Sequence, residues 1–453
     1  MNVVHIVVKN TSTLDYSIPY LCSLRKKFKD ATITVLYCAA NRKQILRNSQ
    51  YYDKIFDEYG VEQLDYSDFL KVDNLLFKFF WRSFFAISYY DNVSLRSFIK
   101  HPLFLKGNVI KHILAGPRKK LDRWLCSRFV DPKSIFQNLD PNLIVFDHRG
   151  RIDIVFEKEF SFFFKEKKIP VILVPHAAHV DNETDEFVPF TLSDEAFPHY
   201  CDHWSCFRYA KPFLLFPTSK KSQFAMIGHP GLDSSWLTEV ILGKSLTDKK
   251  KVIQNKLRVL VLSRRFIPKN MKKPEGMDPG VLEFAEVVSF FRKIDSALKA
   301  TQSPYEIIVK PHPSSSFPEN MRALKEAKLK NFRISYEPFF DLLGEIDLTI
   351  TEFSSSVAFS VLGNVPTILL NSPLQDYAHS LWFRLEELYT GLRYFVENPD
   401  QDLVPTLKLA LRDNLKRNMW LDECENPDIA HFRKFYEDKA VSRALARTEY
   451  LLK

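Results

Sequence analysis

Two polar segments in the second half of the chain have residue types suited to binding an anion. The first, Lys310-Pro311-His312-Pro313, follows the apolar run 305–309 and precedes three serines. An imidazole held between two prolines can donate a charge-assisted hydrogen bond to a phosphate, worth about 1.5–3 kcal/mol. A histidine that only closes a turn is the structural alternative.

The second segment lies between the apolar runs 348–350 and 357–362 and reads Thr351-Glu352-Phe353-Ser354-Ser355-Ser356. Serine hydroxyls and free backbone N–H groups at the start of a helix attract anions, and the helix dipole adds to this attraction. An ordinary serine N-cap is the alternative. A third segment, Ser263-Arg264-Arg265, follows the run 258–262 and offers a guanidinium, which suits phosphate well. A solvent-facing arginine pair would explain that segment equally well.

Candidates for proton transfer lie in the first half. Asp147 and His148 follow the apolar run 143–146, and His176 follows the run 171–174. A carboxylate or imidazole at such a strand end could deprotonate an acceptor hydroxyl, typically worth about 10²–10⁴ in rate. Asp147 ranks first as base or nucleophile and His176 next. The remaining candidates are weaker: His148, His179, Asp181, and Asp233 in the turn after Gly228. Structural or metal-binding histidines are the alternative, although no ligand spacing demands zinc, so no metal site is expected.

Short apolar runs alternate with amphipathic stretches along most of the chain, which predicts β-α units with parallel sheets. Ligands of open α/β sheets bind beyond the carboxyl ends of the strands, where all of these candidates fall. We therefore predict an α/β fold with two Rossmann-like domains facing a central cleft, the layout of GT-B glycosyltransferases. The predicted boundaries are residues 1–240 for an acceptor domain, 241–256 for a linker, 257–405 for a donor domain and 406–453 for C-terminal helices.

Composition excludes several other classes of protein. The chain has 453 residues, 45% hydrophobic and 26% charged, which rules out a mainly disordered protein. Its 12 glycines form neither G-x-G-x-x-G nor a P-loop, which disfavours classical dehydrogenases and P-loop NTPases. Six cysteines are scattered without C-x-x-C pairing, and no signal-peptide pattern is visible. Both features favour a cytoplasmic location.

Positive charge is concentrated in one aromatic-rich segment, residues 75–128. This segment holds 11 Lys and Arg against two Asp, so it accounts for the whole net charge of +9. Cations interleaved with aromatic rings suit an anionic membrane surface, and we predict a basic, aromatic helical insertion that makes the protein peripheral to the membrane. The alternatives are an ordinary core with a solvated basic face or, less favoured, a nucleic-acid surface; no nucleic-acid partner is expected.

Lys-Pro-His-Pro, followed about 40 residues later by Thr-Glu-Phe-Ser-Ser-Ser and a Gly-x-x-Pro strand, resembles bacterial surface-polysaccharide GT-B transferases. One similar group is the sialyltransferases and capsular Kdo transferases, whose His-Pro and Ser-Ser motifs bind the CMP part of the donor. The other is the CDP-glycerol glycerophosphotransferases, which carry a similar Thr-Asp-Tyr-Ser-Ser. The resemblance implies that His312 and Ser354, Ser355 and Ser356 contact the donor phosphate, with Glu352 nearby.

Together these features predict a glycosyltransferase that transfers a CMP-activated ulosonic acid, of Kdo or sialic acid type, to a surface polysaccharide or lipid-linked glycan. The predicted donor-binding residues are Ser263, Arg264, Lys310, His312, Glu352, Ser354, Ser355 and Ser356. No cofactor beyond the nucleotide-sugar donor is expected. A CDP-polyol phosphotransferase, a UDP-sugar 2-epimerase-like enzyme and a non-catalytic nucleotide-sugar-binding scaffold remain the alternatives.

Overall fold

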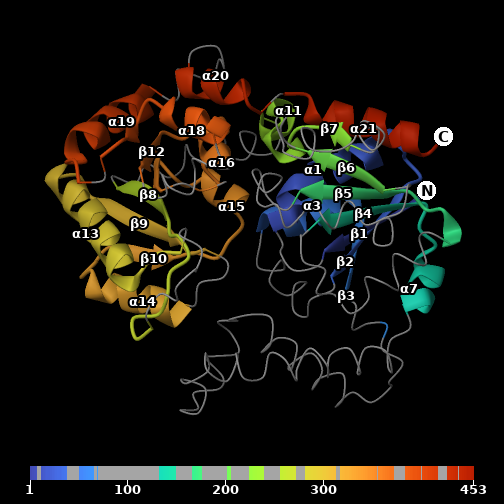
Figure 1. Ribbon diagram of the computed structural model, residues 1–453, viewed down its shortest axis with the longest axis horizontal. Helices are drawn as coiled ribbons and strands as arrows, with labels where there is room; N and C mark the ends of the chain where they lie inside the picture. Colours follow the sequence, from blue (N-terminus) through green and yellow to red (C-terminus); the bar gives the residue numbers. More distant parts are fainter. Residues whose placement is uncertain are drawn as a thin grey trace. The chain divides into compact units, whose positions relative to one another are not determined.

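The computed structural model describes residues 1–7, 12–37, 50–65, 69, 132–148, 166–175, 201–205, 224–238, 256–271, 281–312, 317–352, 354, 356–371, 383–398, 400–416, 426–436 and 438–453. These residues form two α/β units (Figure 1). The first comprises Met1–Gly231 and Ala440–Lys453, and the second comprises Leu232–Lys439. Each unit contains one parallel sheet flanked by helices, which confirms the predicted α/β class.

The sheet of the first unit has the strand order β3-β2-β1-β4-β5-β6-β7, and each neighbouring pair is parallel. Its central strands consist of near-continuous apolar runs whose side chains are buried, as is usual for strands of a parallel sheet. The strands are β1 (Asn2–Val7), β2 (Thr32–Tyr37), β3 (Val61–Asp65), β4 (Leu143–His148), β5 (Val171–Pro175), β6 (Cys201–Ser205) and β7 (Phe224–Met226).

The described helices of this unit are α1 (Ser12–Lys27), α3 (Gln50–Tyr59), α7 (Pro132–Leu139) and α21 (Ala440–Leu451). A buried histidine joins α1 to the sheet. His5 Nδ1 lies 3.1 Å from the Val145 carbonyl, which can only accept, so Nδ1 carries the proton and Nε2 accepts from the Ser17 hydroxyl at 2.8 Å. This fully buried Ser–His pair is therefore satisfied within the core and fixes β1, β4 and α1 together.

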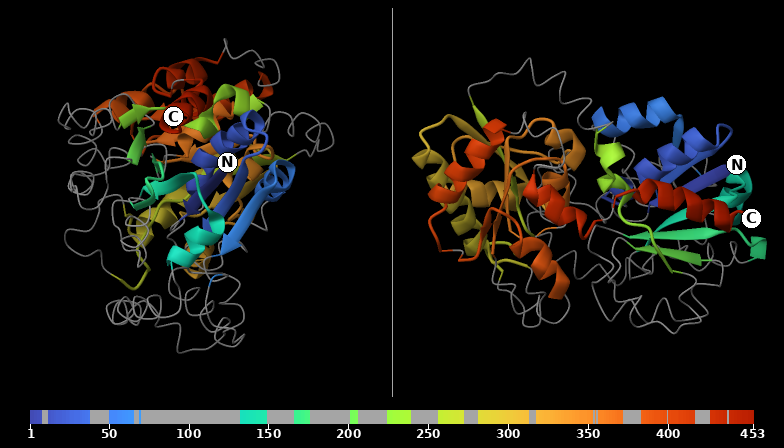
Figure 2. Two further views of the ribbon diagram at one scale, coloured as in Figure 1. Left: turned by 90° about the vertical axis from the view of Figure 1, so that its right-hand side faces the viewer. Right: turned by 90° about the horizontal axis from the view of Figure 1, so that it is seen from above.

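The last helix, α21, belongs to the first unit and packs along α1, as Figure 2 shows for the red helix beside the blue one. Arg447 forms a two-pronged ion pair with the buried carboxylate of Asp202, at 2.6 and 2.9 Å. The buried hydroxyls of Tyr20 and Thr448 lie 2.7 Å apart. The structure thus separates residues 440–453 from the C-terminal helices before them, because their side chains complete the core of the first unit.

A glycine turn ends the first passage of the chain through the first unit. Gly228 has φ +89°, a conformation that residues with a side chain rarely adopt. At Gly231, a Cβ would lie 2.0 Å from the Asp15 carbonyl oxygen, so only glycine fits without movement. The first of the two segments that form this unit ends at Gly231, within the short 3₁₀ helix η5 (Pro230–Leu232).

The sheet of the second unit has the order β10-β9-β8-β11-β12-β13, again with parallel neighbours. The strands are β8 (Leu257–Leu262), β9 (Tyr305–Lys310), β10 (Phe332–Ile334), β11 (Leu348–Thr351), β12 (Thr367–Leu370) and β13 (Phe395–Val396). The alternation of apolar runs and amphipathic stretches in the sequence predicts strands at 258–262, 305–310, 332–335, 348–351 and 367–370, and these match β8 to β12 within a residue at each end.

Helices cover both faces of this sheet. Side chains of α13 (Phe284–Ala300), α14 (Phe317–Glu326) and α19 (Val404–Lys416) share a buried core with one face. On the other face, α16 (Val357–Leu362) contacts β11 through a 3.0 Å hydrogen bond between the Thr349 and Ser360 hydroxyls. The remaining helices are α11 (Ser234–Trp236), α15 (Phe339–Leu343), α18 (Phe383–Thr390) and α20 (Pro427–Arg433).

The chain enters and leaves the second unit at neighbouring points. The Asp438 carboxylate accepts hydrogen bonds from the backbone N–H of Ser234, at 2.8 Å, and from its hydroxyl. Arg433 donates to the Leu232 carbonyl at 2.7 Å and lies 3.6 Å from Asp438. These contacts tie the first and last residues of this unit together.

Several predicted segments lie outside the described residues. They include the basic aromatic segment 75–128 and the linker 241–256 apart from its last residue. Within the described ranges, no helix is both long and apolar enough to cross a membrane.

Candidate functional site

Three adjacent strand ends bring the predicted donor-binding residues to one edge of the second sheet. Strand β8 lies between β9 and β11, and Leu262 pairs with both Lys310 and Thr351. Neighbouring strands lie about 4.8 Å apart, so the residues that follow these ends must be close. The described members of this set are Ser263, Arg264, Lys310, His312, Glu352, Ser354 and Ser356; Ser355 lies outside the described residues.

The serines form a turn that a buried tyrosine holds in place. Ser354 Oγ accepts a hydrogen bond from Ser356 N at 3.3 Å, and the Ser354 carbonyl accepts from Val357 N at 3.1 Å. The hydroxyl of Tyr389, from α18, donates to the same carbonyl at 3.2 Å, and burial raises the pKa of this tyrosine. The helix that follows has only six residues and Ser356 does not cap it through its side chain, so the hydroxyls and the turn, more than a helix dipole, define this surface.

A cation and a carboxylate meet where β8 and β11 end. Arg264 Nη1 lies 3.8 Å from Glu352 Oε2, and their side chains are only 11% and 14% exposed. The distance is that of an ion pair without a hydrogen bond. Oε2 is buried, and no described residue forms a hydrogen bond with it. Burial raises the pKa of Glu352 from 4.5 to about 7; Arg264 lowers it and Glu286 raises it further.

Lys310 and His312 of the Lys-Pro-His segment differ in exposure. Lys310 is half-buried, and its ammonium group donates to the backbone carbonyl of Glu337, after β10. His312 is exposed. Ser263 is buried, and its backbone N–H donates to the Lys310 carbonyl at 3.0 Å, which continues the ladder one residue beyond the strands. The edge therefore offers a half-buried arginine, an exposed imidazole and serine hydroxyls, a set that suits an anionic phosphate.

Two of the predicted bases lie at the corresponding edge of the first sheet. Asp147 and His148 are the last residues of β4, where they pair with Val174 and Pro175 of β5. Their side chains lie outside the described set, as do His176, His179 and Asp181. Their role as bases stays a prediction.

Asp233 has a local structural contact. Its buried carboxylate accepts hydrogen bonds from Ser235 N at 3.2 Å and Ser235 Oγ at 2.7 Å, and so caps α11. Aspartate commonly caps the amino terminus of a helix in this way. The sequence indicated a turn here, and the structure shows what the carboxylate holds in it.

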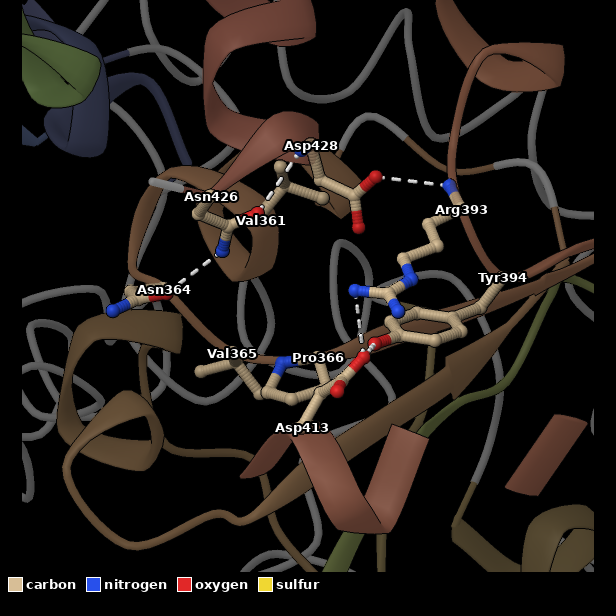
Figure 3. A pocket seen from close by; sticks show the side chains of 9 residues that line it. All are labelled: Val361, Asn364, Val365, Pro366, Arg393, Tyr394, Asp413, Asn426 and Asp428. Atoms are coloured by element: carbon tan, nitrogen blue, oxygen red, sulfur yellow. Dashed lines mark hydrogen bonds and ion pairs between the residues drawn. The ribbon is translucent and has the colours of Figure 1, made fainter. Parts of the chain in front are cut away.

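A small polar cavity lies at the opposite, amino-terminal edge of the second sheet (Figure 3). Arg393 contacts two carboxylates there: its guanidinium lies 2.9 Å from Asp413, and its backbone N–H donates to Asp428 at 2.9 Å. Tyr394 also donates to Asp413, and burial raises the pKa of Asp428. The cavity holds about 10 Å³, room for about one water molecule, so this network joins helices α19 and α20 to the sheet and offers no room for a nucleotide.

Two contributors to the site were missed by sequence reasoning. Tyr389 stands 35 positions after the serine it supports, and no local pattern connects the two. Glu286 is the third residue of α13, and with Glu283 it forms a capping box that the sequence does contain. Within the described ranges, no group of three or more His, Cys, Asp or Glu residues is placed to hold a metal ion.

The two parallel-sheet units and their strand-end site define the GT-B class of fold. Among solved structures of similar fold is UDP-N-acetylglucosamine 2-epimerase from Rickettsia bellii, with 13% identity, a TM-score of 0.50 and coverage of 100% of this chain and 96% of that one. A second UDP-N-acetylglucosamine 2-epimerase shares 13% identity at a TM-score of 0.51, covering 99% of this chain and 96% of that one. The S. aureus MnaA–UDP co-structure shares 10% identity at a TM-score of 0.51, covering 100% of this chain and 97% of that one.

At these identities the likeness shows the fold. No protein-family model matches the chain, and no curated protein matches it either.

Proposed function

We propose that the chain is a nucleotide-sugar-dependent glycosyltransferase that binds the donor phosphate at the carboxyl edge of the second sheet. One observation carries the proposal: Arg264, His312 and the serine turn follow strands β8, β9 and β11, which are direct neighbours. These groups come from segments spread over about 90 residues, and each carries a different phosphate-binding group. A structural turn at one strand end would not require polar groups at the other two.

For the donor we propose a CMP-activated ulosonic acid, of Kdo or sialic acid type, and for the acceptor a surface polysaccharide or lipid-linked glycan. The support is the resemblance of the His-Pro and Ser-Ser segments to those transferases. Asp147 or His176 of the first unit would remove the proton from the acceptor hydroxyl, while the nucleotide leaves from the second unit. Similarity of fold to UDP-N-acetylglucosamine 2-epimerases keeps sugar epimerisation as the competing activity.

We also propose that residues 75–128 hold the enzyme at an anionic membrane surface, on the basis of their charge and aromatic content. Replacing Arg118, Lys119 and Lys120 by Glu should reduce sedimentation with phosphatidylglycerol liposomes. Equal sedimentation of this variant and the parent protein would contradict the membrane role.

A thermal-shift panel of CMP, CDP, UDP, GDP and ADP tests the donor proposal. A ligand at 100 times its Kd stabilises the folded state by about 2.7 kcal/mol, which raises the Tm of a unit of this size by about 5–10 °C. We expect a shift with CMP that His312→Ala greatly reduces, because loss of one charge-assisted hydrogen bond weakens binding about 10- to 100-fold. Lys256 is half-buried just before β8, at the other edge of the sheet, so Lys256→Ala is the matched control and should keep the shift.

The outcomes separate the competing functions. A shift with UDP alone, together with conversion of UDP-N-acetylglucosamine in the absence of an acceptor, would identify an epimerase. A shift with CDP alone would favour polyol phosphate transfer. No shift with any nucleotide, or an unchanged shift in His312→Ala, would contradict the proposed site.

A further inference from the structure

The carboxyl group of Glu352 is buried beside a cation to which it is not hydrogen-bonded. Strand pairing between Leu262 and Thr351 forces Arg264 and Glu352 together, yet Nη1 and Oε2 remain 3.8 Å apart. Oε2 is buried and, among the residues that the structure describes, has no hydrogen-bond partner. A buried polar oxygen is normally paired, so an unpaired one beside a proposed binding surface indicates a group that gains its partner from a ligand or a proton.

The charges around Glu352 come from three other elements. Arg264, after β8, favours the ionised carboxylate, whereas Glu286, from α13, disfavours it. Lys310, at the end of β9, directs its ammonium group to the Glu337 carbonyl, and His312 is exposed. Because burial is the largest influence, the pKa of Glu352 lies at about 7, so both protonation states are populated near neutral pH.

We propose that Glu352 is a positioning residue that takes up one proton when the phosphate of a nucleotide sugar binds at Arg264. This inference rests on the proposed function. In the free protein, the ionised carboxylate balances the charge of Arg264. A bound phosphate brings its own negative charge to the guanidinium, and an ionised Glu352 beside it would be repelled.

Transfer of a proton from solvent to Oε2 removes that repulsion. The neutral carboxyl group then has an O–H that can donate a hydrogen bond to an oxygen of the ligand, which would satisfy the atom left unpaired in the free protein. The proton comes from hydronium or a buffer acid, whose bond to that proton breaks as the new O–H forms. The neutral Glu352 thereby no longer competes with the phosphate for the charge of Arg264.

Isothermal titration calorimetry with CMP-N-acetylneuraminate and UDP-N-acetylglucosamine tests the inference. The phosphates of these probes carry no group that titrates near neutral pH, whereas free nucleotides do. If only the protonated form binds, Kd should rise about tenfold from pH 6 to pH 8, by linkage to a group that titrates near 7. Two buffers of different ionisation enthalpy should show uptake of about one proton per ligand at pH 8 in the wild-type protein.

Glu352→Gln resembles the protonated state, so it should bind with a Kd that changes less than twofold over this range and without proton uptake. At pH 8 it should bind about tenfold more tightly than wild type. Glu397→Gln, an exposed glutamate after β13 in the same unit, is the matched control and should keep the wild-type pH dependence.

Each other result overturns the inference in a distinguishable way. A wild-type Kd that does not vary with pH, or a Glu352→Gln variant with the wild-type slope, would show that Glu352 does not titrate on binding. A folded Glu352→Gln that fails to bind at any pH would show that the carboxylate itself is needed. Failure of wild type to bind either probe at any pH would instead refute the proposed function, and the inference with it.

Discussion

Replacement of Glu352 by glutamine should change the pH dependence of stability in the ligand-free protein. The pKa of this carboxyl group is about 7 in the folded chain, against an ordinary value of 4.5. This difference of about 2.5 corresponds to about 3.4 kcal/mol, at about 1.36 kcal/mol per pKa unit. Because the side chain is only 14% exposed, little of this energy is lost to solvent screening.

The sign follows from linkage between protonation and folding. A carboxyl group with a raised pKa in the folded state contributes stability that is fully present below pH 4.5 and is lost as pH rises through about 7. Glutamine cannot titrate. The free energy of unfolding of wild type minus that of Glu352→Gln should therefore fall by about 3 kcal/mol between pH 4.5 and pH 8.

The assay has to report on the second unit alone, because the two units can unfold separately. Hydrogen exchange of peptides from β8 and β11 in urea, followed by mass spectrometry, gives that local free energy. The difference in free energy of unfolding between wild type and Glu397→Gln should stay the same from pH 4.5 to pH 8. A difference between wild type and Glu352→Gln that is equal at pH 5 and pH 8 would refute the reasoning about burial.

Two further predictions concern the first unit. Gly231→Ala should destabilise it by about 2–3 kcal/mol, because the new Cβ would meet a carbonyl oxygen at 2.0 Å. The control is Gly344→Ala in the second unit, where a new Cβ would meet no described atom within 4 Å, so stability in thermal melts should change by less than about 1 kcal/mol. Equal melting of the two variants would contradict the close approach. Asp202→Asn should cost about 3 kcal/mol in urea denaturation followed by tryptophan fluorescence, because it removes the buried charge that pairs with Arg447. An unchanged midpoint would show that this pair contributes nothing to stability.

Most strands buried on both faces could be predicted from the sequence, whereas two edge strands, β3 and β13, could not. The runs that became β1, β8 and β9 are largely apolar because most of their side chains are buried in the sheets. Strand β3, with the sequence Val-Glu-Gln-Leu-Asp, lies at a sheet edge where one side of its backbone has no partner strand. Its polar residues resemble a loop, and the two-residue β13 at the far edge of the second sheet is too short to give a pattern.

The residue types at the candidate site could be predicted from the sequence, but the surroundings of their side chains could not. The serines and His312 stand next to apolar runs, so their place at strand ends follows from local pattern. The pKa of Glu352 depends on its burial, on the charge of Arg264, about 90 positions earlier, and on the charge of Glu286 of α13. Such burial depends on strand order and helix packing, which a local pattern does not contain. For the same reason, the membership of α21 in the first unit, through Arg447 and Thr448, was not visible.

The return of α21 to the first unit has a consequence for synthesis on the ribosome. Residues 232–439 separate most of the first unit from its last helix, and at about 5–20 residues per second they take about 10–40 s to emerge. During that interval the nascent first unit leaves the Tyr20 hydroxyl and the Asp202 carboxylate without Thr448 and Arg447. The N-terminal half of this protein therefore completes its fold last, after the C-terminal half has already been made.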